Sequence, residues 1–246
     1  MPRNATAYPN IVARAEWLAE RRKLLTEEKT LTRARDALNA ARRRLPMVRV
    51  EKDYEFTGPE GTLSLLDMFS GRSQLIVGHF MFDPEWENGC PSCTHMADEI
   101  SSGQVGHLRD GNTEFAYVSR APLPKIEAYK ARRGWTFPWN SSFGGDFNYD
   151  FHVTLDRSVA PPEYNYKSEE ELAAAGMELK DGQSVELPGF SMFLRIEKEI
   201  FHTYSTYARG GEMIGGSHYM LDLTAWGRQQ DFEDSPDGWP QQPTYG

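Results

Sequence analysis

A nearly continuous apolar run occupies positions 74 to 82, with the residues Gln-Leu-Ile-Val-Gly-His-Phe-Met-Phe. A run of this kind is typical of a strand that is buried on both faces of a parallel sheet, because a half-exposed strand alternates apolar with polar residues. A second buried strand is predicted from Thr113 to Ser119. The two strands favour an α/β fold in which helices cover both faces of a sheet.

Each of these strands is followed by a helical pattern. The first begins at Gly89-Cys90-Pro91-Ser92-Cys93 and continues to about Leu108. The second covers Pro124 to Arg133 and ends at Gly134, as a glycine C-cap does. The order strand, helix, strand, helix predicts a right-handed βαβ unit.

The remaining segments complete a coarse map of the chain. We expect an N-terminal helical arm over residues 1–46, an α/β domain over residues 47–228 and a C-terminal tail over residues 229–246. Within the domain, the composition predicts a strand-like start at Val48, a turn at 58–61, a short helix at 63–69, an ordered loop at 135–150, a polar surface insertion at about 156–188, a hairpin of 190–196 and 199–204, and a short helix at 216–224.

The arm has an apolar residue at every seventh position, namely Trp17, Leu24, Leu31, Leu38 and Leu45. Neither glycine nor proline interrupts this pattern before Pro46, so the arm predicts one helix, or two helices broken near Thr26. The second apolar column of a coiled coil is weak, because Glu20 and Glu27 lie in it. We therefore expect the arm to pack on the domain or on a second subunit, as in a homodimer.

Charge is divided unevenly between the arm and the rest of the chain. Residues 10–45 hold ten Lys and Arg against five Asp and Glu, whereas residues 46–246 hold sixteen against thirty-one. An acidic domain repels the phosphate backbone of a nucleic acid. The three arginines after Ala41 lie at the end of the predicted helix, where their positive charges interact favourably with the helix dipole. No nucleic-acid partner is therefore expected. No stretch approaches the roughly 20 apolar residues of a membrane helix, and charges interrupt residues 1–30, which favours a cytoplasmic location without membrane contact.

Cys90 and Cys93 are the only cysteines of the chain. A C-x-x-C that follows a buried strand and opens a helix is typical of a thioredoxin-like redox motif. The helix N-terminus lowers the pKa of the first thiol, so Cys90 is the predicted nucleophile. Cys93, one turn inside the helix, would resolve a mixed disulfide, and Pro91 suits the first helical position. We expect no cofactor beyond a redox-active Cys90–Cys93 disulfide.

Two other interpretations of the cysteine pair stay open. A thioredoxin-like scaffold can carry it without redox activity. A structural zinc site needs four ligands at defined spacing, and only His79, His95 and His107 lie near the cysteines in sequence. We therefore expect no metal.

Six blocks of the sequence, in register, resemble a known bacterial family. They are Gly78 to Phe82, Gly89 to Cys93, Val118 to Pro122, Trp135 to Trp139, Asp146 to Phe151 and Phe201 to Tyr207. They are similar to the bacterial thioredoxin-like family catalogued as domain of unknown function 899, over roughly residues 10 to 228. The resemblance implies a thioredoxin-like mixed sheet flanked by helices, related in outline to peroxiredoxins, with an N-terminal helical extension and a polar insertion before the C-terminal hairpin. It implies no established substrate.

The sequence departs from the better-known relatives of that family in one motif. Peroxiredoxins place Pro and then Thr or Ser ahead of the peroxidatic cysteine, whereas residues 84–90 here carry no hydroxyl before Cys90. The motif therefore does not support a peroxidase. Thioredoxins also place a cis-proline opposite the C-x-x-C, and Pro188 is the candidate for that position.

Further site residues follow from the geometry of a parallel sheet, whose ligands meet the carboxyl ends of the strands. Arg120 directly follows the second strand and is expected to stabilise the Cys90 thiolate or to hold an anionic substrate, unless it pairs with a carboxylate such as Glu127. Three tryptophans are candidates for the wall of an apolar substrate cleft, although such residues also serve as plain packing. They are Trp86, Trp135 and Trp139.

Two functions from different classes remain. The leading hypothesis is a thiol–disulfide oxidoreductase, with a thiol or disulfide substrate and a protein reductant as partners. The alternative is a non-catalytic binding module that holds a partner in its aromatic cleft. Fold alone does not decide between them.

Overall fold

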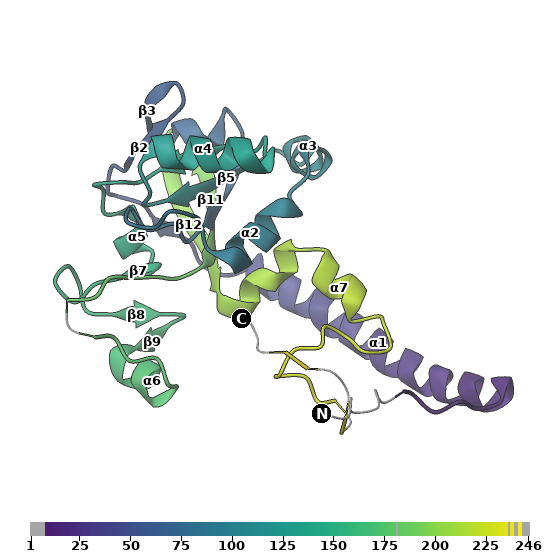
Figure 1. Ribbon diagram of the computed structural model, residues 1–246. Coiled ribbons are helices and arrows are strands. Elements are labelled where there is room, and N and C mark those ends of the chain that lie inside the picture. The colour runs from purple at the N-terminus through teal and green to yellow at the C-terminus, as the bar shows by residue number, and fades with distance from the viewer. Residues whose placement is uncertain (1–7, 181, 236, 239–240, 243–246) are drawn as a thin grey trace. The chain divides into compact units, whose positions relative to one another are not determined.

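The structure is a computed structural model, and it describes residues 8–180, 182–235, 237–238 and 241–242 (Figure 1). The chain forms two compact units. One comprises residues 47–215, and the other comprises residues 1–46 together with residues 216–246. The first unit carries the predicted site.

An eight-stranded mixed sheet forms the centre of the unit 47–215. Its strand order is β1-β12-β11-β4-β5-β6-β2-β3, in which β4, β5 and β6 run parallel and the other neighbours are antiparallel. The strands are β1 (Val48–Arg49), β2 (Glu55–Gly58), β3 (Gly61–Ser64), β4 (Gln74–His79), β5 (Thr113–Ser119), β6 (Trp139–Ser141), β11 (Gly189–Ile196) and β12 (Glu199–Tyr207). The mixed sheet that the resemblance implied is confirmed.

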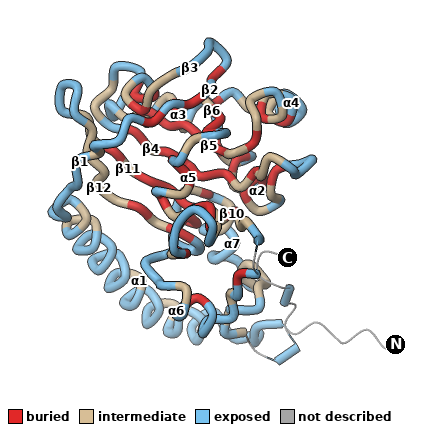
Figure 2. Tube along the Cα trace, turned by 90° about the vertical axis from the view of Figure 1, so that its left-hand side faces the viewer, coloured by how far each residue is buried: buried red, intermediate tan, exposed pale blue. Residues whose placement is uncertain are grey.

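Strands β4 and β5 are buried along most of their length (Figure 2). Their alternate side chains supply two separate cores, as expected for strands that are buried on both faces. On one face, Phe80, Phe115 and Tyr117 pack with residues of α2 (Pro91–Asp98), α3 (Ser102–Asp110) and α4 (Leu123–Arg133). On the other face, the partners of the strands come from α5 (Phe147–Asp150) and the short helix η1 (Asp67–Phe69). The predicted α/β arrangement is therefore confirmed.

Several boundaries differ from the predictions. The helix after the C-x-x-C breaks into α2 and α3, because the Ser101 side chain accepts the Gln104 N–H and caps a new helix. The short helix predicted at 63–69 is limited to η1, because β3 extends to Ser64. The loop predicted at 135–150 contains β6 and α5. The helix that ends at Gly134 and the C-terminal hairpin are confirmed.

The polar insertion has a small core of its own. Its elements are β7 (Thr154–Leu155), β8 (Glu163–Tyr164), β9 (Lys167–Ser168), α6 (Glu169–Ala174) and β10 (Val185–Glu186). Tyr164 and Leu172 are buried there together with Tyr207 of β12. The Tyr164 hydroxyl donates to the Pro188 carbonyl at 2.8 Å. The insertion is thus attached to the main sheet at the start of the hairpin.

The second unit contains α1 (Arg14–Arg42) and α7 (Ser217–Leu221). The arm forms a single helix without a break at Thr26, and none of its residues is buried. The apolar stripe of α1 is 46 to 65% exposed at Trp17, Leu24, Leu31 and Leu38. The homodimer stays a prediction. Within the described ranges, every helix is too short or too polar to cross a membrane.

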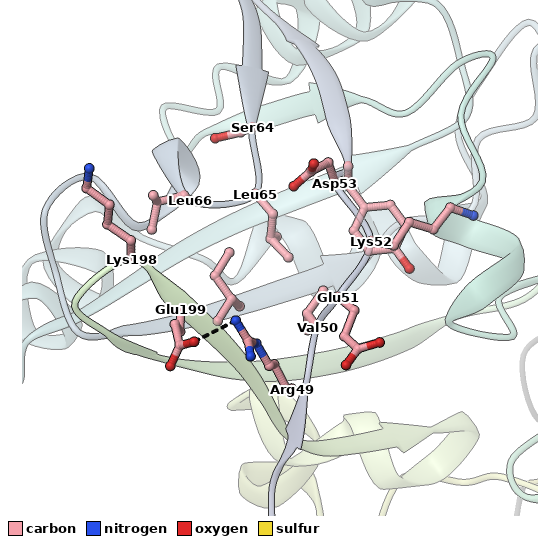
Figure 3. A pocket seen from close by; sticks show the side chains of 12 residues that line it. Arg49, Val50, Glu51, Lys52, Asp53, Ser64, Leu65, Leu66, Lys198 and Glu199 are labelled. Atoms are coloured by element: carbon pink, nitrogen blue, oxygen red, sulfur yellow. Dashed lines mark ion pairs between the residues drawn. The ribbon is translucent and has the colours of Figure 1, made fainter.

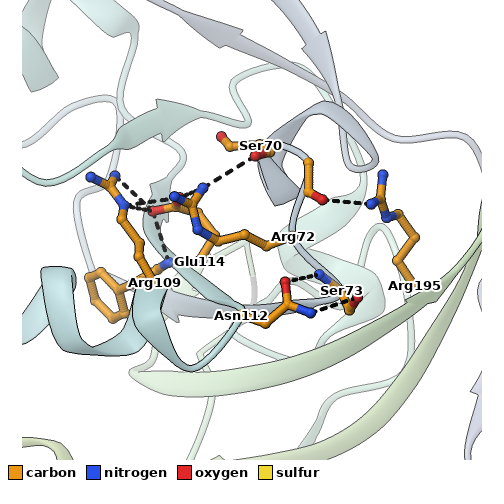
Figure 4. Close-up of polar contacts among 9 residues, drawn as sticks. Ser70, Arg72, Ser73, Arg109, Asn112, Glu114 and Arg195 are labelled. Carbon is orange, nitrogen blue, oxygen red and sulfur yellow. Dashed lines mark hydrogen bonds and ion pairs between the residues drawn. The ribbon is translucent and has the colours of Figure 1, made fainter.

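A buried ion cluster lies at the start of β5 (Figure 4). The Glu114 carboxylate, 1% exposed, accepts hydrogen bonds from Arg72 at 2.8 Å and from Arg109 at 2.9 to 3.1 Å. Arg109 belongs to α3, and Arg72 lies in the loop before β4. A buried carboxylate is tolerated when it is paired and hydrogen-bonded, so the cluster holds α3 and this loop against the sheet.

Gly78 allows the tightest contact in the centre of the sheet. A Cβ atom at Gly78 would lie 2.4 Å from Cε1 of Tyr117 and 3.0 Å from Cε1 of Phe190. We expect Gly78→Ala to lower the free energy of unfolding by about 1–3 kcal/mol through overpacking. Gly106→Ala in α3, where nothing lies within 4 Å, is the control and should stabilise by about 0.5–1 kcal/mol. Urea unfolding of both variants measures the contrast, and equal stabilities would contradict it.

Candidate active site

Cys90 is the N-cap residue of α2, and the end of β4 holds it in place. Its N–H donates to the Met81 carbonyl at 3.0 Å, which returns the loop after β4 to that strand. Gly89 lies so close to the Phe80 ring that a Cβ there would be 2.5 Å from Cε1. Pro91 occupies the first turn of α2, where its missing N–H costs nothing. The sequence therefore fixes the thiol at a helix N-terminus, as predicted.

The surroundings of Cys90 favour a thiolate. The thiol of Cys93 donates a hydrogen bond to the Cys90 sulfur, and the Ser92 hydroxyl lies 3.1 Å from that sulfur. These groups, with the N–H groups of Cys93 and Ser92, lower the Cys90 pKa to about 5. Burial acts in the opposite direction but is the weaker effect. Cys90 is only partly buried, and a partly exposed thiolate can act as a nucleophile.

Cys93 has the opposite properties. It is 6% exposed within the core on the helical side of the sheet. Its hydrogen bond to Cys90, burial and the charge of Cys90 raise the Cys93 pKa well above the ordinary thiol value. Both cysteines are free thiols in the structure. Cys90 is therefore the better nucleophile of the pair, and Cys93 is held ready behind it.

The first turn of α2 is fastened to α4. The Thr94 hydroxyl donates to the Cys90 carbonyl at 2.8 Å and accepts the Tyr129 hydroxyl at 2.9 Å. Thr94 and Tyr129 are both buried. This chain fixes the orientation of the helix end that carries the two sulfurs.

The structure gives Arg120 different partners from those expected. Its guanidinium donates to Glu186 at 2.7 Å and to Ser184 at 3.0 Å, lies 3.7 Å from Asp83, and packs over the Tyr149 ring. The main causes of the low Cys90 pKa do not include Arg120. The structure therefore favours carboxylate pairing of Arg120 over the expected contact with the thiolate, while a role in holding an anionic substrate stays a prediction. Nor is Glu127 the partner of Arg120.

Glu186 is the buried member of this ion pair. Its side chain is 2% exposed, and burial raises its pKa to about 7, although Arg120 and Thr154 favour the ionised form. Glu186 lies on β10 of the insertion, whereas Arg120 and Asp83 follow β5 and β4. The pair thus connects the insertion to the sheet edge that carries the Cys90 loop.

The three tryptophans do not form one cleft. Trp139 is 0% exposed, and its indole N–H donates to the Ser119 hydroxyl at 2.9 Å, so its predicted role in a substrate wall is wrong. Trp135 is half-buried against Trp139 and donates to Asp98 at 2.9 Å. Trp86, in the loop before Cys90, is 39% exposed. Only Trp86 and Trp135 can therefore meet a substrate.

Pro188 also departs from the prediction. No peptide bond in the described part of the chain is cis, so Pro188 is not the cis-proline of thioredoxins. It immediately precedes β11, and its carbonyl accepts the Tyr164 hydroxyl. Its place directly before the hairpin agrees with the prediction.

Sequence reasoning missed a buried polar network on the other face of the sheet. His79 Nε2 lies 2.8 Å from the Ser191 hydroxyl, which lies 2.8 Å from the Ser205 hydroxyl, which in turn lies 2.7 Å from His202 Nε2. Burial, with a smaller effect from His202, lowers the His79 pKa to about 3. The network joins β4, β11 and β12, and no local pattern could have shown that these side chains meet.

A hollow elsewhere in the unit 47–215 has neither cysteine in its lining (Figure 3). It has a volume of about 560 Å³ and is lined by residues 49–54, 64–66 and 198–200. Arg49 and Glu199 pair across it at 2.6 Å. Over the described residues, no group of three or more His, Cys, Asp or Glu side chains is arranged to hold a metal ion. The candidate active site is therefore the cysteine pair.

Two solved structures are similar to this chain. Peroxidoxin BcpB from Mycobacterium tuberculosis is 11% identical, with a TM-score of 0.47, and the match covers 69% of this chain and 93% of that chain. Peroxiredoxin Q from Xanthomonas campestris is 11% identical, with a TM-score of 0.42, and the match covers 65% and 84% respectively. No curated protein sequence matches the chain significantly.

The sequence blocks quoted above indicated one bacterial family, and the comparison with protein families gives the same result. The match extends over residues 6–245, which include α1, the whole sheet and the cysteine pair. The chain belongs to the family described as bacterial protein of unknown function (DUF899).

Proposed function

We propose that the protein is a thiol–disulfide oxidoreductase in which Cys90 is the nucleophile and Cys93 the resolving thiol. The observation that carries the proposal is the Cys90 sulfur at the N-terminus of α2, hydrogen-bonded by the Cys93 thiol and the Ser92 hydroxyl. A thiolate at neutral pH beside a second, protonated thiol is the arrangement that disulfide exchange needs.

The reaction has two steps. The Cys90 thiolate attacks one sulfur of a substrate disulfide, a Cys90–substrate disulfide forms, and the other substrate sulfur leaves as a thiolate. Cys93 then loses its proton and attacks the Cys90 sulfur. The Cys90–Cys93 disulfide forms, and the second substrate sulfur leaves and takes up the proton. Two electrons pass from the cysteine pair to the substrate, and a protein dithiol or another thiol reductant restores the pair.

The low Cys90 pKa also affects the direction of transfer. A sulfur that is stable as a thiolate is a good leaving group and stabilises the reduced form, which makes the disulfide form more oxidising. The same two steps can therefore also run in reverse, with a substrate dithiol that reduces the Cys90–Cys93 disulfide. The exposed Trp86 and the half-buried Trp135 supply apolar contacts for such a substrate.

The alternative of a non-catalytic binding module has less support. It relied on a cleft walled by three tryptophans, and Trp139 lies wholly inside the core. It also leaves the lowered pKa of the Cys90 thiol without a role. A peroxidase is not proposed, since the loop over residues 84–89 carries no hydroxyl to bind peroxide.

Alkylation tests the roles of the two cysteines. We expect iodoacetamide to label Cys90 first, with a rate that rises through a midpoint near pH 5, because its thiolate is stabilised by Cys93 and Ser92. Mass spectrometry of the peptide that contains both cysteines, over a pH series, measures this. Cys90→Ser should remove the fast labelling, and Cys93→Ser should keep Cys90 reactive at a higher midpoint. Faster labelling of Cys93, or two midpoints near the ordinary value of about 8.5, would contradict the proposal.

Replacement of Arg120 separates stability from reactivity. Arg120→Ala leaves Glu186 buried without its cation, so we expect a loss of about 3 kcal/mol in the free energy of unfolding. The Cys90 alkylation midpoint should not change, since Arg120 is not among the main causes of the Cys90 pKa.

The loss should depend on pH in a defined direction. Glu186 has a raised pKa in the folded state, so its protonated form is the stable one and stability is lost as the pH rises through about 7. Arg120→Ala should therefore cost most above that value and less below it. In urea unfolding, the double variant with Glu186→Gln should recover most of the loss. A shift of the Cys90 midpoint would show instead that Arg120 acts on the thiolate.

A further inference from the structure

The Tyr117 hydroxyl is a buried polar group that has no hydrogen-bond partner. Tyr117 is 2% exposed on β5, in the core that also contains Cys93. Its ring is surrounded by aromatic side chains, with Phe80 and Phe115 in edge contact and Phe190 at 6.3 Å between centroids. Phenylalanine would fill the same space without burying an unsatisfied hydroxyl, so the hydroxyl needs an explanation.

The other buried ring donors of this core are satisfied. The Tyr129 hydroxyl bonds to Thr94, and the Trp139 indole N–H bonds to Ser119. Cys93 is another buried side chain of this core, and its sulfur can accept a hydrogen bond. Cys93 is therefore a candidate partner for the Tyr117 hydroxyl in a state other than the reduced one.

Two contacts bring Tyr117 and Cys93 to the same part of the core. The Tyr117 ring lies across β4 at Gly78, where a Cβ would clash with it at 2.4 Å. The Cys93 sulfur lies at the end of the same strand, within reach of the Met81 N–H. Burial raises the pKa of Tyr117, and the negative charge of a Cys93 thiolate would raise it further. The phenol therefore stays protonated and can donate a hydrogen bond.

In the reduced state the Cys93 thiol donates a hydrogen bond to the Cys90 thiolate and keeps its proton. When Cys90 is held in a mixed disulfide, its sulfur is neutral and Cys93 must itself become a thiolate. We propose that the Tyr117 hydroxyl then donates a hydrogen bond to the Cys93 thiolate and so speeds its attack on Cys90. The proposal rests on the function proposed above. Tyr117 donates a hydrogen bond only, and the proton of Cys93 goes to the departing substrate thiolate.

The test uses an aromatic disulfide that releases a coloured thiolate. In stopped-flow mixing with the reduced protein, the first equivalent reports attack by Cys90 and the second reports resolution by Cys93. For Tyr117→Phe we expect an unchanged first phase. The second phase should be about ten- to a hundredfold slower, because a hydrogen bond to a charged group is lost. Its pH midpoint should rise by about one to two units.

The control is Tyr207→Phe, which removes a buried hydroxyl that bonds to the Phe151 carbonyl, in the core of the insertion and not in the core of Cys93. It should lower stability and keep the pH midpoint of the second phase, whereas Tyr117→Phe should keep or raise stability. An unchanged second phase in Tyr117→Phe would overturn the inference. Absence of the first phase in the natural protein would instead overturn the proposed function on which it rests.

Discussion

Strands β4 and β5 are buried on both faces along most of their length, and the two largest cores of the unit 47–215 are built on them. Their alternate side chains enter two cores that are dominated by aromatic rings. Each fully buried large apolar side chain contributes about 1.5–3 kcal/mol, so this double burial is the main stabilising term of the fold. Because both strands run parallel, their carboxyl ends meet at one edge, where the Cys90 loop and Arg120 begin.

Two buried carboxylates lie near the two ends of β5, and each is paired with arginine. Glu114 binds Arg72 and Arg109 at the amino end, and Glu186 binds Arg120 beyond the carboxyl end. Removing one partner of such a pair would leave an uncompensated buried charge. The first pair therefore holds α3 against the sheet, and the second holds the insertion against the sheet. This explains why an arginine at a functional edge of the sheet need not be catalytic.

The candidate active site depends on a different scale of structure. The groups that stabilise the Cys90 thiolate lie within three residues of it, on the first turn of α2. The packing beneath that turn comes from remote elements, through Thr94, Tyr129 and the Tyr117 ring. Reactivity of Cys90 is thus a local property, whereas the fate of Cys93 is set by the core in which it is buried.

The amino-acid sequence determined the features that depend on neighbouring residues. Apolar runs predicted β4 and β5, the glycine after Arg133 predicted the end of α4, and the C-x-x-C after a buried strand predicted a thiol at a helix N-terminus. Each of these follows from local backbone preferences and from the burial pattern of one segment.

Only the tertiary structure decided which distant side chains meet. Arg120 binds Glu186, which lies 66 residues further along the chain, and Trp139 is buried in the core. Strand pairing and packing determine these contacts. The same holds for the unpartnered Tyr117 hydroxyl in the core of Cys93 and for the network from His79 to His202. The sequence of one segment does not show which residues of β5, β10 or β11 lie beside it in the fold. Chemistry at the helix end could therefore be predicted, while its supporting partners could not.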